Sequence, residues 1–222
     1  MWIKICANTN LHDAQLAATL GADALGFVFA PSPRQITPWQ VAEITPHLPH
    51  NIEKIGVFST QDITEITAAV HTAGLTGVQL HSSYSPQLIA ALTHHFAGRL
   101  RLIQTAHWNV GTQTTADFAA TIQSFQHSPH IASVLVDSRT PSASGGTGTP
   151  FDWHAARQVL ATLAPKPLIL AGGLKPQNLA TAIRELNPWG VDVASGVEAH
   201  PGTKDPIKLA EFITIARQSQ AS

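Results

Sequence analysis

Short apolar or β-branched runs alternate with longer segments of helical period along this chain, and that alternation constrains the fold more than any other feature. The pattern is typical of βαβ units, in which helices connect the parallel strands of one sheet. Eight strands are predicted, at Trp2–Cys6, Ala24–Phe29, Lys54–Phe58, Gly77–Leu80, Leu100–Thr105, Ser133–Val136, Leu168–Ala171 and Val191–Ala194. Helices are predicted to begin near His12, Pro38, Asp62, Pro86, Thr115, Asp152, Pro176 and Asp205. Several of these starts carry Pro or a capping Asp, as helix N-termini prefer.

The number of strand and helix pairs predicts the fold class. Eight pairs in 222 residues fit an α/β fold of the closed (β/α)8 barrel type, and residues 1–222 are expected to form a single domain. An open doubly wound sheet that binds a dinucleotide would carry a glycine fingerprint after its first strand, but residues 6–10 read CANTN. We therefore expect a TIM barrel.

Composition and charge exclude several classes of partner. Apolar residues make up 44% of the chain and charged residues 12%, so a buried core is expected rather than disorder. The formal net charge is −1, without an acidic or basic run, so we expect no nucleic-acid partner and no membrane partner. A small-molecule ligand is expected instead, and no obligate protein partner is evident.

The cysteine and histidine content bears on compartment and metal binding. The single cysteine, Cys6, excludes an internal disulfide and predicts a reducing, cytoplasmic location. Of the 12 histidines, His94 and His95 are adjacent on a predicted helix and point different ways. His127 and His130 flank a proline in a predicted loop. No metal site is therefore predicted.

The active site of such a barrel lies at the carboxyl ends of its strands, so reactive residues there are the first candidates. Cys6 ends the first strand. It is either a small buried apolar residue or a general base, and a base would need some thiolate at neutral pH. Lys4 lies on the same face of that strand. It is expected to pair with a carboxylate such as Asp192 on the neighbouring last strand, or else to tune the site.

A second candidate, Asp137, directly follows the apolar run Val134–Val136. It is either a turn or cap residue, or a general acid, and an acid would need a pKa raised by burial or by nearby negative charge. The glycine-rich segment Ser138–Pro150 follows it and is expected to be an active-site loop.

Two glycine-bearing turns follow the last two predicted strands. Their residues are Gly172, Gly173, Ala194, Ser195 and Gly196. Tight turns alone would explain the glycines, but the backbone at these two positions commonly binds a phosphate group in this fold. In barrel order, Cys6 and Asp137 flank this phosphate site from opposite sides. That placement suits a base and an acid that act on one extended substrate.

Short motifs recur at the strand ends in a fixed order. In the first half they are KIC at 4–6, GADALGFVF at 21–29 with SPR at 32–34, GVF at 56–58 and VQLH at 78–81. In the second half they are VDS at 136–138, GGTG at 145–148 before FDW at 151–153, LAGGL at 170–174, GVD at 190–192 and SGVE at 195–198. This ordered set resembles the phosphoribosylanthranilate isomerase family over nearly the whole chain.

The resemblance implies a role for each matching residue. Cys6 would be the general base, Asp137 the general acid and Arg34 a contact to the anthranilate end of the substrate. Gln79 and His81 would line the pocket floor, and the glycine turns would bind the phosphate. The reaction implied is the Amadori rearrangement of N-(5-phosphoribosyl)anthranilate to 1-(2-carboxyphenylamino)-1-deoxyribulose 5-phosphate in tryptophan biosynthesis, and it needs no cofactor.

The chain departs from the family's motifs at two positions. Ala7 and Ser82 stand where the family usually has Gly, and either change is expected to shift the backbone at the pocket rim, because these residues tolerate positive φ poorly. Two rival functions stay open. One is another sugar-phosphate barrel enzyme, such as indole-glycerol-phosphate synthase or the tryptophan synthase α chain. The other is a non-catalytic barrel that binds a phosphate ligand, although the presence of both Cys6 and Asp137 argues against it.

Overall fold

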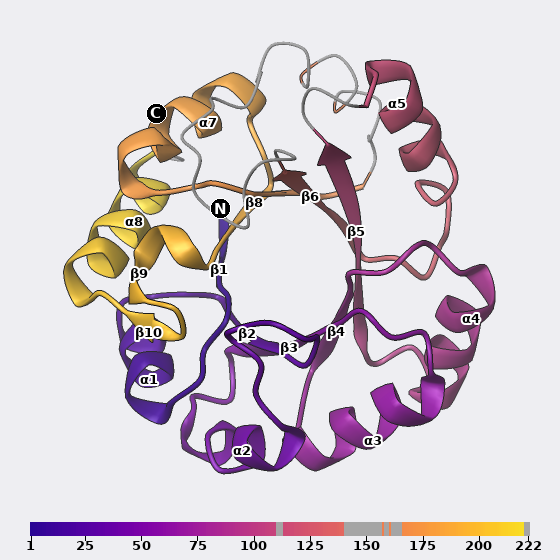
Figure 1. Cartoon of the computed structure of the whole chain (residues 1–222), viewed down its shortest axis with the longest axis horizontal. Helices are drawn as coiled ribbons and strands as arrows, with labels where there is room; N and C mark the ends of the chain where they lie inside the picture. The colour runs from indigo at the N-terminus through magenta and orange to yellow at the C-terminus, as the bar shows by residue number, and fades with distance from the viewer. Residues whose placement is uncertain (110–112, 140–156, 158–159, 161–165, 220–222) are drawn as a thin grey trace.

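Eight parallel strands close into a barrel in the computed structural model, with helices around its outside (Figure 1). Neighbouring strands follow chain order, and the last strand pairs with the first. The strands are β1 Trp2–Ile5, β2 Ala24–Val28, β3 Glu53–Phe58, β4 Gly77–Leu80, β5 Arg101–Asn109, β6 Ser133–Arg139, β7 Leu168–Ala171 and β8 Gly190–Val193. The structure describes residues 1–109, 113–139, 157, 160 and 166–219. The predicted fold class is confirmed.

The helices begin where the sequence supplies capping residues. Those described are α1 Leu11–Thr19, α2 Pro38–Ala42, α3 Ile63–Ala73, α4 Pro86–His95, α5 Thr115–Gln123, α7 Pro176–Leu186 and α8 Pro206–Gln218. Short elements are the 3-10 turns η1 Thr45–His47 and η3 Ser195–Val197, and the antiparallel pair β9 Glu198–His200 and β10 Thr203–Lys204. Asp62, Ser85 and Asp205 accept hydrogen bonds from first-turn N–H groups of α3, α4 and α8. The helix predicted near Asp152 lies outside the described residues.

Two strands are longer than predicted. β5 continues past Thr105 to Asn109, and β6 continues past Val136 to Arg139, so that the two extensions pair with His107 opposite Asp137. The predicted ends were wrong because they were placed where the apolar run stops, whereas inward-facing residues at a barrel mouth are polar. Asp137 therefore lies within β6 rather than after it. The rest of the predicted active-site loop, 140–150, lies outside the described residues.

The interior of the barrel is built in layers, because every second strand residue faces inward. An apolar cluster fills the lower interior and extends through Ala171 toward the mouth; its members are Trp2, Ala24, Ile55, Ile103, Leu135, Ile169 and Ala171. Lys4 follows Trp2 by two residues on β1 and is fully buried. Cys6 follows Lys4 by two residues. The layers thus pass from apolar to polar toward the C-terminal mouth, where the candidate residues lie.

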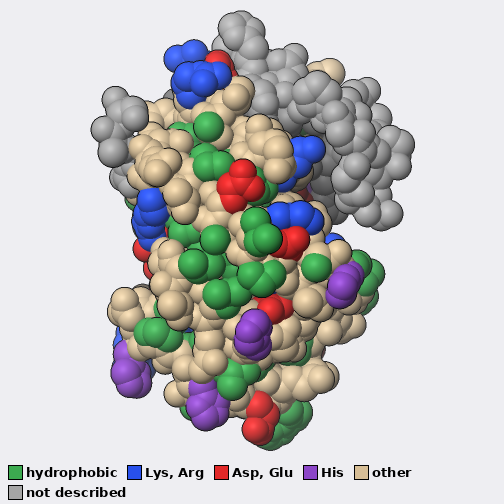
Figure 2. All heavy atoms as spheres, turned by 90° about the vertical axis from the view of Figure 1, so that its left-hand side faces the viewer, with side chains coloured by type: hydrophobic (Ala, Val, Ile, Leu, Met, Phe, Trp, Pro, Cys, Tyr) green, Lys and Arg blue, Asp and Glu red, His purple; other side chains and the backbone are tan. Residues whose placement is uncertain are grey.

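The outer surface carries mixed charges. On the face formed by α1, α7 and α8, acidic and basic side chains are interspersed among apolar and polar ones rather than gathered by sign (Figure 2). Among the helices in the described ranges, none has both the length and the apolar character needed to cross a membrane.

Candidate active site

A buried ion pair forms the polar layer below the mouth. Lys4 Nζ lies 2.9 Å from Asp192 Oδ1 and donates a second hydrogen bond of 2.9 Å to Gln79 Oε1. Lys4 and Asp192 are paired in register on β1 and β8, which confirms the predicted pairing. Burial by itself would lower the pKa of Lys4, but the charge of Asp192 and the hydrogen bond to it oppose burial, and the pKa is raised. Lys4 is therefore a cation fixed beneath Cys6.

Cys6 directly follows β1 at the mouth. Its backbone N–H donates to the Val193 carbonyl at 2.8 Å, and the residue is only 7% exposed. Gly26 lies opposite on β2, and a Cβ there would collide with the Cys6 sulfur, so glycine leaves room for the thiol. Burial raises the pKa of the Cys6 thiol, and the Lys4 ammonium offsets only part of that rise. At neutral pH Cys6 is therefore held mainly as the thiol.

The backbone after Cys6 is left-handed. Ala7 has a φ of +60° and is buried, in a conformation that costs an L-residue roughly 1–2 kcal/mol. Glycine would adopt it without that cost. Ser82 behaves differently, because it is not among the described residues with positive φ. Of the two departures from the family motifs, only Ala7 strains the backbone.

Three side chains meet on another side of the mouth. His107 Nδ1 lies 3.6 Å, and His81 Nε2 lies 4.0 Å, from the same oxygen of Asp137, Oδ2. The two imidazoles pack edge to face, with ring centroids 4.4 Å apart. The side chains of His81, His107 and Asp137 are 24%, 27% and 19% exposed, so the cluster is open to small solutes. This arrangement holds an ionisable acid beside two groups able to exchange protons with it.

Arg34, in the segment after β2, is held by a buried acid. Its Nε and Nη2 donate to the two carboxylate oxygens of Glu198 at 2.9 and 2.7 Å. Lys204 Nζ lies 3.4 Å from the same carboxylate and donates to the Cys6 carbonyl at 2.6 Å. Burial would raise the pKa of Glu198, but the hydrogen bonds from Arg34 and the charge of Lys204 outweigh it and lower that pKa. Glu198 thus occupies the Nε and Nη2 edge of the guanidinium, and the edge formed by Nη1 and Nη2 is the other face able to donate two hydrogen bonds.

The glycine turns after β7 and β8 lie against each other. Gly172 and Gly173 have φ angles of +85° and +64°, which favour glycine. Gly196 approaches the Leu174 carbonyl so closely that a Cβ would not fit between them. Gly173 and Ser195 are exposed. The two turns therefore present one stretch of backbone at the mouth, with no side chain at Gly173 to obstruct an anion.

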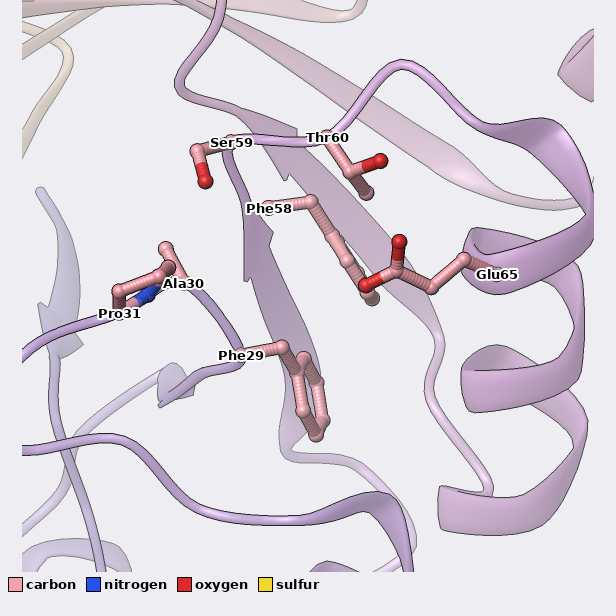
Figure 3. A pocket seen from close by; sticks show the side chains of 7 residues that line it. All are labelled: Phe29, Ala30, Pro31, Phe58, Ser59, Thr60 and Glu65. Carbon is pink, nitrogen blue, oxygen red and sulfur yellow. The ribbon is translucent and has the colours of Figure 1, made fainter.

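A cavity of about 180 Å³ adjoins the ends of β2 and β3 (Figure 3). It is lined by Phe29, Ala30, Pro31, Phe58, Ser59, Thr60 and Glu65. The Phe29 and Phe58 rings stack with centroids 4.9 Å apart, and Glu65 reaches in from α3. Neither Cys6 nor Asp137 lines this cavity, so it lies beside the reactive groups rather than around them.

Comparison with known proteins decides the family. A family model described as N-(5'phosphoribosyl)anthranilate (PRA) isomerase matches residues 3–215. The chain belongs to this family. N-(5'-phosphoribosyl)anthranilate isomerase of Pelobacter propionicus is 41% identical over 220 residues, covering 99% of this chain and 97% of that protein. The crystal structure of phosphoribosyl anthranilate isomerase from Thermotoga maritima has a TM-score of 0.84 at 33% identity, covering 98% of this chain and 99% of that one.

A further solved structure contains a ligand. It is phosphoribosyl anthranilate isomerase in complex with reduced 1-(o-carboxyphenylamino)-1-deoxyribulose 5-phosphate, with a TM-score of 0.81 at 31% identity, covering 98% of this chain and 99% of that chain. By contrast, 3-hexulose-6-phosphate synthase of Salmonella typhimurium shares only the fold, with a TM-score of 0.69 at 14% identity. The barrel alone therefore does not choose among sugar-phosphate enzymes. The family match does, and it favours the isomerase over the other barrel enzymes considered above.

The predicted residues fall into two groups in this family member. Asp137 and His81 are brought together, and Gln79 lies just below them in the polar layer, where its Nε2 is 3.3 Å from Thr105 Oγ1. Arg34 instead lies with Glu198. His107 was not predicted at all, because the fifth strand was ended at Thr105. Every second residue of a strand faces the barrel interior, so extending the strand by two residues beyond Thr105 would have identified His107.

Proposed function

We propose that this chain rearranges N-(5-phosphoribosyl)anthranilate to 1-(2-carboxyphenylamino)-1-deoxyribulose 5-phosphate, with Asp137 as general acid and Cys6 as general base. One observation supports the assignment of roles: Cys6 directly follows β1 and Asp137 lies near the carboxyl end of β6, so both are at the same mouth of the closed barrel. The buried pair of Lys4 and Asp192 lies below Cys6, and the charge of Asp137 acts on Asp192 as well. The acid and the base therefore face one space.

The first step in this proposal opens the ribose ring. Asp137 gives its proton to the ring oxygen as the bond between that oxygen and C1′ breaks. The anthranilate nitrogen supplies the electron pair that forms the C=N bond, so a protonated imine results. A carboxyl group can act in this way only if it holds a proton when substrate binds. His81 and His107 are the groups placed to influence that proton.

The second step removes the proton from C2′, which the adjacent iminium makes acidic. Cys6 takes this proton, and the electron pair left on C2′ forms the C1′=C2′ bond of an enolamine. Tautomerisation of the enolamine then gives the ketone product without any change in total atoms or electrons. Because burial raises the pKa of the Cys6 thiol, the positive charge of Lys4 beneath it is needed to make the thiolate accessible.

The remaining residues would bind the two ends of the substrate. We assign the phosphate to backbone N–H groups at Gly172, Gly173, Ala194, Ser195 and Gly196. We assign the anthranilate carboxylate to the outer edge of Arg34, because the inner edge is held by Glu198. Gln79 and His81 would form the floor between them. The balanced charge and the single cysteine support a cytoplasmic enzyme whose partner is this small molecule.

The test is to remove each proton-transfer group without changing its size. Asp137→Asn cannot deliver a proton, and Cys6→Ser carries a hydroxyl that is far harder to ionise than a thiol. We expect kcat to fall by roughly 10²-fold or more in each variant, while substrate Kd changes little. Loss of anthranilate-linked fluorescence in freshly made substrate measures the rate, and melting temperature verifies the fold.

A near-native kcat in either folded variant would remove that residue from its role. The same assay decides the rival function, a non-catalytic barrel that only binds a phosphate ligand. Such a protein would bind the substrate or product without accelerating the loss of substrate fluorescence. Replacing Cys6 or Asp137 would then make no difference to the rate of that loss.

A further inference from the structure

The side chains of His81, His107 and Asp137 converge as a group of possible metal ligands. His107 Nε2 lies 3.1 Å from the His81 carbonyl oxygen. Because a carbonyl can only accept, Nε2 must carry the proton, and the lone pair of neutral His107 is on Nδ1. That Nδ1 is buried, makes no hydrogen bond within the described part of the chain, and lies 3.6 Å from Asp137 Oδ2. Nδ1, the ring nitrogen that is able to bind a metal ion, therefore faces the Asp137 carboxylate.

His81 adds a third donor to the same point. Its Nε2 lies 4.0 Å from Asp137 Oδ2, and one ligand atom from each of the three residues lies within 4.8 Å of the others. In a tetrahedral zinc site, bonds of roughly 2.0–2.2 Å place neighbouring donor atoms about 3.3–3.5 Å apart. The three distances between donor atoms therefore exceed metal-site spacing by roughly 0.1 to 1.5 Å. Small side-chain rotations would close that gap.

The surroundings of the cluster also resemble those of a metal site. Metal-binding histidines usually donate their other ring N–H to a carbonyl or carboxylate, which fixes the tautomer and aims the lone pair. His107 has this arrangement through the His81 carbonyl. Two imidazoles and one carboxylate suit Zn²⁺ and its neighbours rather than Mg²⁺ or Ca²⁺, which prefer oxygen ligands. The partial exposure of all three side chains leaves a path for the ion and a position for water.

We propose that His81, His107 and Asp137 form a binding site for a divalent transition metal such as Zn²⁺, and that the bound ion inhibits the enzyme. A coordinated Asp137 carboxylate has no proton to give, and the ion would occupy the space next to the reacting ring oxygen. Metal binding is independent of the proposed function, whereas the inhibition rests on it.

The binding test uses Co²⁺ as a spectroscopic probe on the full-length protein without substrate. We expect the visible absorption of a four- or five-coordinate Co²⁺ site, with Zn²⁺ displacing the probe. His107→Asn and His107→Phe should each weaken Co²⁺ and Zn²⁺ binding by at least about tenfold, which is a modest loss for a ligand. The Phe variant keeps the ring against His81, so a fold defect in one variant would not explain a loss seen in both.

Two matched variants separate this site from others. His71 and His95 lie on the surface with their Nε2 atoms 3.3 Å apart, so they are the competing imidazole pair. The double change His71→Ala with His95→Ala should leave the spectrum unchanged, as should Cys6→Ser. A spectrum with thiolate charge-transfer bands, or one lost with the surface pair, would overturn the proposal. So would unchanged binding in both His107 variants, which would mean that only a proton occupies the cluster.

Inhibition is then measured against each variant's own metal-free rate. The Zn²⁺ concentration that halves the wild-type rate should rise at least about tenfold in the His107 variants and stay unchanged in the surface double variant. Binding without inhibition would overturn the regulatory part and would also argue against Asp137 as the acid. Absence of binding would leave the acid role untouched, so the two failures are distinguishable.

Discussion

The two sides of the barrel mouth are built differently. Below Cys6, Lys4 is fully buried and held by two hydrogen bonds of 2.9 Å to Asp192 and Gln79. At Asp137, the neighbouring imidazole nitrogens lie 3.6 and 4.0 Å away, and each side chain is about one-fifth to one-quarter exposed. The first side is fixed before any ligand arrives. The second has room for a proton, an ion or a substrate atom.

The difference follows from depth in the barrel. A charge in the middle layer must be paired closely, because water cannot reach it and an unpaired buried charge is costly. A charge in the top layer is partly hydrated, so its partners can remain at longer distances. The fixed side is suited to hold one protonation state, and the open side to change its state during a reaction.

The largest expected effect comes from breaking the fixed side. Asp192→Asn would leave the Lys4 ammonium buried without its counter-ion, so we expect a loss of about 3–5 kcal/mol in the free energy of unfolding. His107→Asn on the open side should cost no more than about 1 kcal/mol. Urea denaturation of both variants measures the contrast.

Equal losses of stability in Asp192→Asn and His107→Asn would contradict the difference proposed between the two sides of the mouth. A further check is the double change Lys4→Met with Asp192→Leu. Because it removes both charges and keeps apolar volume, it should recover much of the loss caused by Asp192→Asn. No recovery would mean that the layer depends on Asp192 for something other than charge pairing.

An intermediate effect concerns the titration of Cys6. Since burial raises the pKa of this thiol, the protonated form persists through neutral pH and the thiolate forms only above the ordinary value of about 8.5. The ultraviolet absorbance of the thiolate should therefore still be increasing above that pH in the native protein. If Cys6 is the base, kcat/KM should rise with pH over the same range.

Two references make this titration unambiguous. Cys6 is the only cysteine, so subtraction of the Cys6→Ser titration leaves its signal alone. The same protein in denaturant gives the ordinary thiol value. A native thiol that ionises below the denatured one would show that Lys4 outweighs burial, contrary to our expectation.

The smallest effect is expected at the strained residue next to Cys6. Ala7→Gly should raise the free energy of unfolding by about 1 kcal/mol or less, because relief of the left-handed strain exceeds the added entropy of glycine in the unfolded chain. Ala14→Gly, in the interior of α1, should lower it instead. Thermal melts compare the two, and a loss of stability at Ala7 as large as at Ala14 would contradict the strain.

Most of the fold could be predicted from the sequence, and the exceptions have a common cause. The apolar runs gave six strands within one residue of their observed ends, because each of those strands has an apolar residue at its carboxyl end. β5 and β6 were cut short at Thr105 and Val136, because the polar residues His107 and Asp137 at the mouth interrupt the apolar pattern there. That error hid His107, although Asp137 on the next strand was recognised.

The sequence by itself determined the layers of this barrel. Strand alternation places Lys4 and Cys6 on one face of β1, and the ordered motifs identify the family through short-range patterns that any alignment can read. Only the tertiary structure decided which charged and ionisable side chains lie next to each other. Register sets Lys4 opposite Asp192 and His107 opposite Asp137, and chain folding brings Glu198 to Arg34 across 164 residues. Such contacts depend on distances of a few ångströms between distant segments, and no local pattern of residues encodes them.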